Sequence, residues 1–128
     1  ITRLADDERL PDLLERALRL PQPQPEGRPY TVVASRSHLS METQMFIEEA
    51  RKEHPDVETI TSGSSLKICL VAEGIADAYP RFAPTMEWDT AAGHAIAACA
   101  GRQVCQAGSD QPLVYNKEDL HNPWFLVK

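Results

Sequence analysis

The chain has 128 residues, 42% of them hydrophobic and 25% charged, which suits one compact domain with a single core. No apolar run approaches the roughly 20 residues needed to cross a bilayer, so no integral membrane segment is expected. The net charge of −6 excludes general nucleic-acid binding, which needs clustered Lys and Arg, but a local group of donors can still bind a small anion. Since the first residue is Ile1 and not a methionine, we expect a further segment upstream.

The first predicted element is an amphipathic helix over residues 6–20, with its acidic residues first and Pro11 in the first turn. Its apolar stripe consists of leucines at helical spacing: Leu10, Leu13, Leu14 and Leu18. Residues 21–29 form a proline-rich connector, too stiff for a helix. We therefore divide the chain into an N-terminal helix with its connector, residues 1–29, and an α/β domain, residues 30–128.

Strands and helices are predicted to alternate from Tyr30 onward. Strands are expected at 31–35, 57–61, 76–82, 103–107, 112–116 and 124–127, with 103–107 and 112–116 paired as a hairpin. Helices are expected at 40–53, between the turn at 62–65 and Gly74, and at 86–101. The helix at 40–53 begins at Ser40 and has Met41, Met45, Phe46 and Ala50 available for the core. This alternation predicts an α/β layered domain with a mostly parallel or mixed β-sheet and flanking helices.

Three polar motifs fall where predicted strands end and helices begin, which is where such sheets bind ligands. In the first, Gly63, Ser64, Ser65 and Lys67 join a strand to a helix. Unpaired backbone N–H groups at a helix start can hold a phosphate, and two hydroxyls and an ammonium would strengthen that grip. The alternative is an ordinary capped helix with a surface lysine.

The second motif is the run Ser35, Arg36, Ser37, His38, directly after a buried strand. Two hydroxyls, a guanidinium and an imidazole suit recognition of a phosphate or a sugar hydroxyl. A polar loop before a helix cap explains the same residues. Arg81, at the end of the third strand, either binds a phosphate, lines an adenine pocket or faces solvent.

The third motif places Asp89 at a helix start, behind Trp88 and before a run of small residues. An aspartate there is either a helix cap or a hard oxygen ligand for Mg²⁺, which proteins usually hold with one or two carboxylates. His94, one turn further on, is interpreted as a structural hydrogen-bonding residue. The segment from Asn122 to Phe125 is interpreted as a clamp for the last strand, without chemistry.

The three cysteines lack metal-ligand spacing. Cys69 and Cys99 lie among Leu, Val and Ala, so buried free thiols are expected. Free thiols suit a reducing compartment, and we expect a cytoplasmic location, with peripheral attachment to the inner membrane left open.

Residues 88–96, WDTAAGHAI, resemble the second signature of the inositol monophosphatase superfamily, in which small residues and a helix follow Trp-Asp. More narrowly, residues 63–95, preceded by VVASRSH at 32–38, look like the bacterial 3′(2′),5′-bisphosphate nucleotidases. Residues 115–127 are similar to the C-terminal tail of those enzymes, so the resemblance covers roughly residues 30–127.

This resemblance implies the C-terminal half of an inositol monophosphatase-like αβαβα fold. It also implies a Mg²⁺-dependent enzyme that removes the 3′-phosphate of 3′-phosphoadenosine 5′-phosphate, giving AMP and phosphate. By matching positions, Asp89 is the Mg²⁺ ligand and adjoins the substrate. The positions that would contact the nucleotide and its 5′-phosphate are Ser35, His38, Gly63 and Lys67, with Arg36, Ser37, Ser64, Ser65 and Arg81 as second-rank candidates.

The superfamily's other metal ligands come from an upstream glutamate and an Asp-Pro-Leu-Asp-Gly-Thr motif, and neither occurs in this sequence. We therefore expect the missing N-terminal half of the enzyme to be a partner of this chain, and the chain alone to be inactive. Two other functions stay open: a phosphatase of the same superfamily acting on an inositol or other sugar phosphate, and a non-catalytic adenine-nucleotide-binding module.

Overall fold

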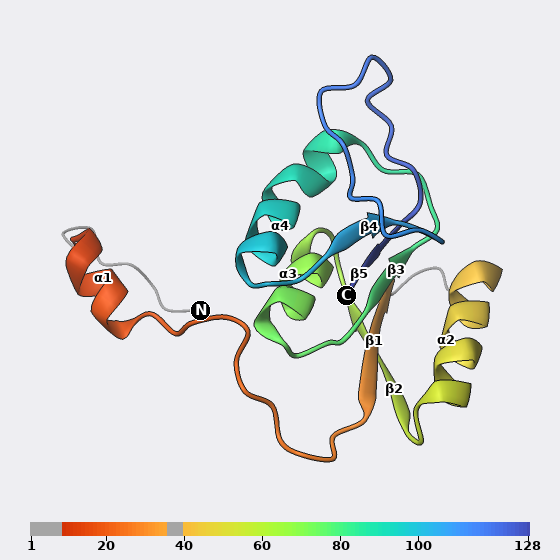
Figure 1. The fold of residues 1–128 in the computed structure, drawn as a ribbon, viewed down its shortest axis with the longest axis horizontal. Coiled ribbons are helices and arrows are strands. Elements are labelled where there is room, and N and C mark those ends of the chain that lie inside the picture. The colour runs from red at the N-terminus through yellow and green to blue at the C-terminus, as the bar shows by residue number, and fades with distance from the viewer. Residues whose placement is uncertain (1–8, 36–39) are drawn as a thin grey trace.

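The computed structural model describes residues 9–35 and 40–128 (Figure 1). Its helices are α1 (Leu10–Arg16), α2 (Met41–Glu53), α3 (Leu66–Glu73) and α4 (Glu87–Cys99). Its strands are β1 (Tyr30–Ser35), β2 (Val57–Ser62), β3 (Tyr79–Arg81), β4 (Val104–Gln106) and β5 (Phe125–Val127). None of the described helices is long and apolar enough to cross a membrane.

The strands form one parallel pair and one antiparallel group of three. β1 and β2 run parallel, with Tyr30 opposite Val57. β5 lies between β3 and β4 and is antiparallel to both. A parallel bridge between Val32 and Ala78 joins the two groups, and the Val33 N–H donates to the Ala78 carbonyl at 2.8 Å. The predicted α/β class with a mixed sheet is confirmed.

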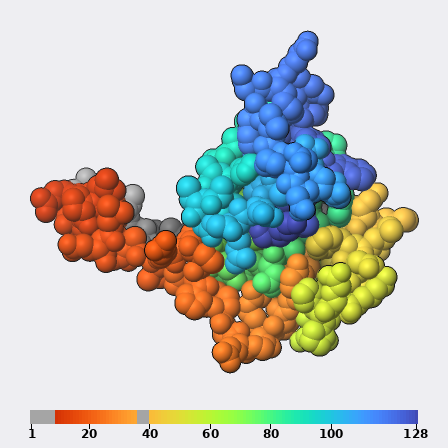
Figure 2. All heavy atoms as spheres, in the orientation of Figure 1, coloured from red at the N-terminus to blue at the C-terminus, as the bar shows by residue number. Residues whose placement is uncertain are grey.

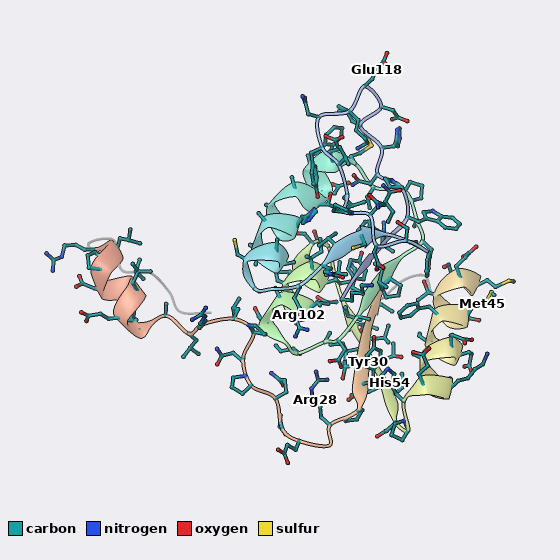
Figure 3. All side chains as sticks on the ribbon, viewed as in Figure 1. Arg28, Tyr30, Met45, His54, Arg102 and Glu118 are labelled. Carbon is teal, nitrogen blue, oxygen red and sulfur yellow. The ribbon has the colours of Figure 1, made fainter. Side chains whose placement is uncertain are left out.

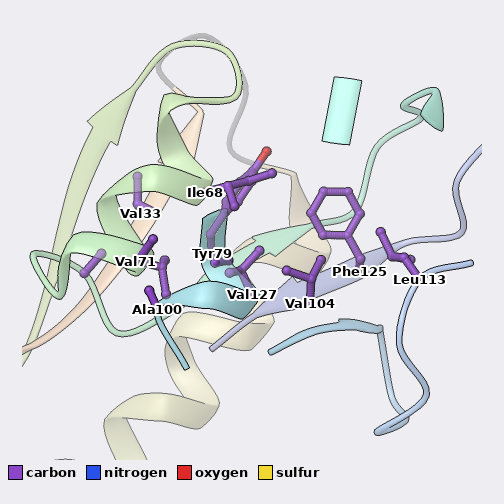
Figure 4. Packing of buried hydrophobic residues seen from close by; sticks show 12 residues of the cluster. Val33, Ile68, Val71, Tyr79, Ala100, Val104, Leu113, Phe125 and Val127 are labelled. Atoms are coloured by element: carbon purple, nitrogen blue, oxygen red, sulfur yellow. The ribbon is translucent and has the colours of Figure 1, made fainter. Parts of the chain in front are cut away.

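The core lies between the strands and the pair α3 and α4, which pack against each other, while α2 contacts β2 and β3 (Figures 1 and 4). Phe125 and Ile68 are the largest side chains that are almost fully buried. The core cluster consists of Val33, Ile68, Val71, Ala72, Ala76, Tyr79, Ala97, Ala100, Val104, Leu113, Phe125 and Val127. This packing fixes the starts of α3 and α4, which carry two of the three polar motifs.

Gly93 in α4 permits the close approach of α4 to α3. A Cβ built at Gly93 would lie 2.9 Å from Cδ1 and 3.2 Å from Cβ of Ile68. We expect Gly93→Ala to lower the free energy of unfolding by about 1–3 kcal/mol, because overpacking outweighs the better helix propensity of alanine. Urea unfolding measures this. Adding Ile68→Val, which removes Cδ1, should restore part of the loss, whereas unchanged stability of Gly93→Ala would contradict the close contact.

α1 is shorter than the predicted helix, because the backbone is already extended at Ala17. Pro11 lies in its first turn as predicted, and residues 6–8 lie outside the described residues. No residue of α1 is buried, and Leu10, Leu14 and Leu18 are exposed. Figures 1 and 2 show α1 standing away from the rest of the described domain. A short helix that buries none of its side chains in a core is marginally stable.

The predicted hairpin of 103–107 with 112–116 is confirmed only in part, because the second segment forms no strand of its own. β4 forms within the first segment and meets the second at an antiparallel bridge between Cys105 and Pro112, flanked by two backbone hydrogen bonds. Its partner in the sheet is β5. The second segment leaves the extended conformation at Asn116, where φ is 64°. The predicted strand at 76–82 is confirmed only as the three-residue β3.

Several side chains expected in the core are exposed instead. Met41 and Met45 face solvent, as Figure 3 shows for Met45, whereas α2 buries Thr43 and Ile47. The expectation of two buried thiols is also wrong for Cys99, which is exposed. Cys69 is partly buried and Cys105 is buried, and all three thiols are free.

Arg28 fastens the connector to the sheet (Figure 3). Its guanidinium donates to both carboxylate oxygens of Asp77, at 2.7 and 2.6 Å, and the Thr31 N–H donates to the same carboxylate at 2.7 Å. A bidentate, partly buried ion pair of this kind is stronger than a typical surface pair. The connector is therefore fixed at the start of β1.

Candidate functional site

A cavity of about 770 Å³ opens where β1, β2 and β3 end and α3 and α4 begin. It is lined by every described residue that the sequence analysis named as a substrate or metal ligand: Ser35, Gly63, Ser64, Ser65, Lys67, Arg81 and Asp89. Arg36, Ser37 and His38 lie outside the described residues. The described residues of the three polar motifs, which are up to 54 positions apart in the sequence (89 − 35), thus line one cavity.

The turn between β2 and α3 presents polar groups to this cavity. Ser64 adopts a left-handed conformation, with φ at 53°, and Ser65 is the N-cap of α3. Gly63 does not have a positive φ, so the left-handed conformation in this turn falls on Ser64 and not on the glycine. The Ser65 side chain makes no capping bond to α3. The first N–H groups of α3 therefore lack a side-chain cap at the cavity, which suits an anion.

Lys67 is only 4% exposed, so the alternative of a surface lysine is wrong. Its ammonium donates to the carbonyls of Ser62 at 3.3 Å and Ser64 at 3.0 Å, and lies 5.3 Å from the centre of the Tyr79 ring. Burial lowers the pKa of Lys67, and the nearby charge of Arg81 lowers it further. A bound anion would stabilise the charged form of Lys67 and so oppose both effects, the burial of the ammonium and its repulsion by Arg81.

Arg81 is half-buried, which rules out the solvent-facing alternative. Its Nη1 lies 3.5 Å from the Ser35 hydroxyl, and its Nη2 donates to the Pro84 carbonyl at 3.3 Å. Its Nε is buried and has no hydrogen-bond partner among the described residues. A buried unpaired donor is costly, so a ligand that accepted this N–H would be favoured.

Asp89 is the third residue of α4, and its Oδ2 accepts the Met86 N–H at 2.8 Å. The aspartate therefore caps the helix start from inside the first turn, and the N-cap itself is Met86. Within the described residues lining the cavity, Asp89 is the only carboxylate, beside the cations Lys67 and Arg81. The cavity is thus locally positive although the chain is acidic.

Asp89 can serve as one ligand of a metal ion but not as a complete site. A carboxylate oxygen at the cavity edge is the donor type that Mg²⁺ prefers. Over residues 9–35 and 40–128, no group of three or more His, Cys, Asp and Glu side chains could hold a metal ion. Further ligands would have to come from outside this part of the chain.

Sequence reasoning assigned no role to several residues of the cavity wall. Trp88, which is 66% exposed, and the half-buried Phe82 both line it, and Trp124 packs edge-on against Phe82 with ring centres 5.7 Å apart. The position of Trp88 next to Asp89 was the available signal. The structural interpretation of His94 is confirmed, since its Nδ1 lies 2.9 Å from the Tyr115 hydroxyl.

A sequence model of the inositol monophosphatase family matches residues 16–124. The chain belongs to the inositol monophosphatase family. Among curated family members, the 3′(2′),5′-bisphosphate nucleotidase CysQ of Escherichia coli K12 is 50% identical over 103 residues. The match covers 80% of this chain and 40% of that protein. The Salmonella typhimurium CysQ is 48% identical over the same number of residues.

Solved structures of family members agree. The crystal structure of CysQ from Bacteroides thetaiotaomicron superposes with a TM-score of 0.88 at 58% identity, covering 98% of this chain and 46% of that one. An inositol monophosphatase from Staphylococcus aureus superposes with a TM-score of 0.61 at 21% identity, over 85% of this chain and 39% of that one, which shows the fold alone. The chain thus spans less than half the length of these relatives. The match with the Bacteroides protein extends beyond residues 30–127 into the N-terminal segment.

Proposed function

We propose that this chain is the nucleotide-binding part of a 3′(2′),5′-bisphosphate nucleotidase. The complete enzyme would remove the 3′-phosphate of 3′-phosphoadenosine 5′-phosphate and give AMP and phosphate. The observation that carries this proposal is one cavity that brings together two cations, one carboxylate and an uncapped helix start. The names of the relatives that are about half identical to the chain support the same reaction.

The phosphate that the substrate retains would lie at the start of α3. The N–H groups and hydroxyls of Gly63, Ser64 and Ser65 would donate to it, with Lys67 beneath the turn and Arg81 beside it. A helix N-terminus and two cations suit a doubly charged phosphate group. Ser35 would contact the nucleotide from the end of β1, together with Arg36, Ser37 and His38 from the adjoining segment.

Mg²⁺ is the proposed cofactor, with Asp89 as the ligand that this chain supplies. When bound, Mg²⁺ supplies positive charge to the reacting phosphate and polarises the attacking water. The hydrogen bond from the Met86 N–H would fix the position of Oδ2 of the Asp89 carboxylate. The remaining ligands are proposed to come from the N-terminal part of the enzyme, which corresponds to the portion of the relatives that this chain does not span.

The test is phosphate release by the complete enzyme with Mg²⁺. We expect release from 3′-phosphoadenosine 5′-phosphate to exceed release from inositol monophosphate in kcat/KM. A preference for inositol monophosphate would assign the enzyme to a sugar phosphatase instead. Tight binding of the nucleotide without any phosphate release would mean a non-catalytic binding module.

Lys67→Ala in the complete enzyme is expected to raise KM for the bisphosphate about ten- to a hundredfold, with a smaller change in kcat. A charge-assisted contact contributes roughly 1.5–3 kcal/mol, and a contact to the retained phosphate acts equally on ground and transition states. Steady-state kinetics measure both constants. Lys52→Ala, which removes an exposed lysine paired with Glu49, is the control for net charge. An unchanged KM in Lys67→Ala would remove Lys67 from the phosphate site.

A further inference from the structure

The C-terminal segment formed by residues 115–122 holds the start of α4. His121 forms an antiparallel bridge with Met86, and the Glu87 N–H donates to the Leu120 carbonyl at 3.0 Å. The Asn122 N–H donates to the Thr85 carbonyl at 2.9 Å. The backbone of residues 85–87, just before Asp89, is therefore paired with residues 120–122, more than thirty positions later in the sequence (122 − 89).

The Asn122 side chain adds a second set of contacts to the same turn. It is 8% exposed, and its Nδ2 donates to the Met86 carbonyl at 2.8 Å and to the Thr90 hydroxyl at 3.0 Å. A third acceptor, the Thr85 hydroxyl, lies 3.2 Å away. Because a carbonyl oxygen can only accept, the nitrogen of the amide must be the atom that faces Met86.

The oxygen of the same amide makes no such contact. Asn122 Oδ1 is buried and has no hydrogen-bond partner within the described ranges. Burying an unpaired acceptor costs about 1–3 kcal/mol, so an asparagine here is a poor choice for packing alone. What asparagine contributes at this position is the set of hydrogen bonds from its side-chain nitrogen to the start of α4.

The backbone groups of Met86 link Asn122 to the Asp89 carboxylate. The Met86 carbonyl accepts from Asn122 Nδ2 and from the Asp89 N–H at 3.0 Å. The Met86 N–H in turn donates to Asp89 Oδ2 at 2.8 Å. Met86 is thus held by Asn122 on one side and holds the carboxylate on the other.

We propose that Asn122 is a positioning residue for Asp89, acting through Met86 and Thr90 to fix the carboxylate for Mg²⁺ binding. This rests on the proposed function, in which Asp89 is a metal ligand. Partners that orient a ligand in this way typically change metal affinity or activity by about 10- to 100-fold when they are removed.

A second tether keeps the C-terminal segment in place when Asn122 is changed. The Glu87 carboxylate accepts the backbone N–H groups of Asn116 at 2.6 Å and Lys117 at 3.1 Å, and also the Lys117 ammonium. The Lys117 ammonium holds the pKa of Glu87 below its usual value. Asn122 variants should therefore retain the folded segment and lose mainly the contact with Met86.

The experiment measures Mg²⁺ affinity of the complete enzyme by isothermal titration calorimetry, beside steady-state kinetics and thermal unfolding. For Asn122→Ala we expect Mg²⁺ binding to weaken about tenfold, with kcat partly restored at saturating Mg²⁺. Leu113→Ala is the control for loss of stability, because Leu113 is also buried, at 4% exposed, but its side chain cannot donate a hydrogen bond to Met86 or Thr90. It should lower thermal stability and leave Mg²⁺ affinity unchanged.

Two results would overturn the positioning role: unchanged Mg²⁺ affinity in Asn122→Ala, or an equal loss of affinity in Leu113→Ala at equal stability. If Asn122→Ala fails to fold, Thr90→Val is the second variant. It keeps the shape of the side chain but removes the Thr90 hydroxyl that accepts from Asn122. Mg²⁺ binding should then weaken several-fold, and an unchanged Mg²⁺ affinity in this variant would also overturn the proposal. Asp89→Asn, titrated in parallel, separates the two claims: intact Mg²⁺ binding in that variant means that the proposed metal ligand itself is wrong.

Discussion

Asp89→Asn in the complete enzyme is expected to reduce turnover by orders of magnitude while leaving thermal stability close to that of the unchanged enzyme. The stability follows from the geometry, because the only described bond of the carboxylate is the one that Oδ2 accepts from the Met86 N–H, and an amide oxygen can accept it too. Losing the negative charge from the first turn of α4 should cost only about 0.3–1 kcal/mol. The loss of turnover follows from the lost negative charge, which Mg²⁺ needs in a ligand.

Phosphate release and thermal unfolding, measured on the same preparation, check this prediction. Asp89→Ala is the comparison, since it removes the charge and also the acceptor for the Met86 N–H, and the loss of that hydrogen bond should lower stability by about 1 kcal/mol. Intact turnover in Asp89→Asn would mean that Asp89 only caps α4. A large loss of stability in Asp89→Asn would mean that the loss of activity has a structural cause.

The second large effect is expected for the chain by itself, which should fold but release no phosphate. Its core is continuous across α3, α4 and the strands. Within the described residues, however, the cavity contains a single carboxylate, and one carboxylate with waters binds Mg²⁺ too weakly to fix it against a phosphate. The measurement is phosphate release from 3′-phosphoadenosine 5′-phosphate with Mg²⁺, at the sensitivity needed to detect the complete enzyme diluted a thousandfold.

Activity should return when the N-terminal part of the enzyme is added, because the chain exposes an apolar surface that suits such a partner. Between Thr90 and Gly101, α4 and its end contain no charged residue, although much of this helix is exposed. The exposed positions there are Ala91, Ala92, Ala95, Ile96, Ala98 and Cys99. A large exposed apolar helix face marks an interaction surface. Turnover by the isolated chain at the rate of the complete enzyme would refute this division of the site.

The elements that carry the motifs could be predicted because their signals are local. β1 and β2 are short runs with β-branched residues, and Ser40 accepts the Thr43 N–H at 3.3 Å as the predicted cap of α2. α4 was expected at 86–101 and forms at Glu87–Cys99. Since strand ends and helix starts follow from such local patterns, the meeting of the motif residues at one edge also followed.

The errors concern contacts between segments far apart in the chain. The prediction paired β4 with the next extended segment, which β4 does contact at Pro112, but it missed the strand β5 that pairs with β4 in the sheet and begins 19 residues after β4 ends (125 − 106). The apolar residues of α2 suggested a core face containing Met41 and Met45. The sheet instead covers the face of Thr43, Ile47 and Ala50, because the orientation of a helix on a sheet depends on the packing of both.

Which residues form the site could be predicted from the sequence, but the burial and the hydrogen bonds of their side chains could not. Burial of Lys67 depends on the turn that folds over it, and the contacts of Asn122 depend on the return of the chain end to α4. Neither has a local signal. Asn122 was accordingly interpreted as a clamp without chemistry, and it is the bonds from its nitrogen to Met86 and Thr90 that connect it with the Asp89 turn.

Both tryptophans of the chain are associated with the cavity and not with the core. Trp88 lines the cavity beside Asp89, and Trp124, which is 48% exposed, rests on Phe82 in the cavity wall. Indole emission depends on how much water surrounds the ring. The intrinsic fluorescence of this protein is therefore an optical signal of the cavity, and occupancy can be followed without attaching a dye.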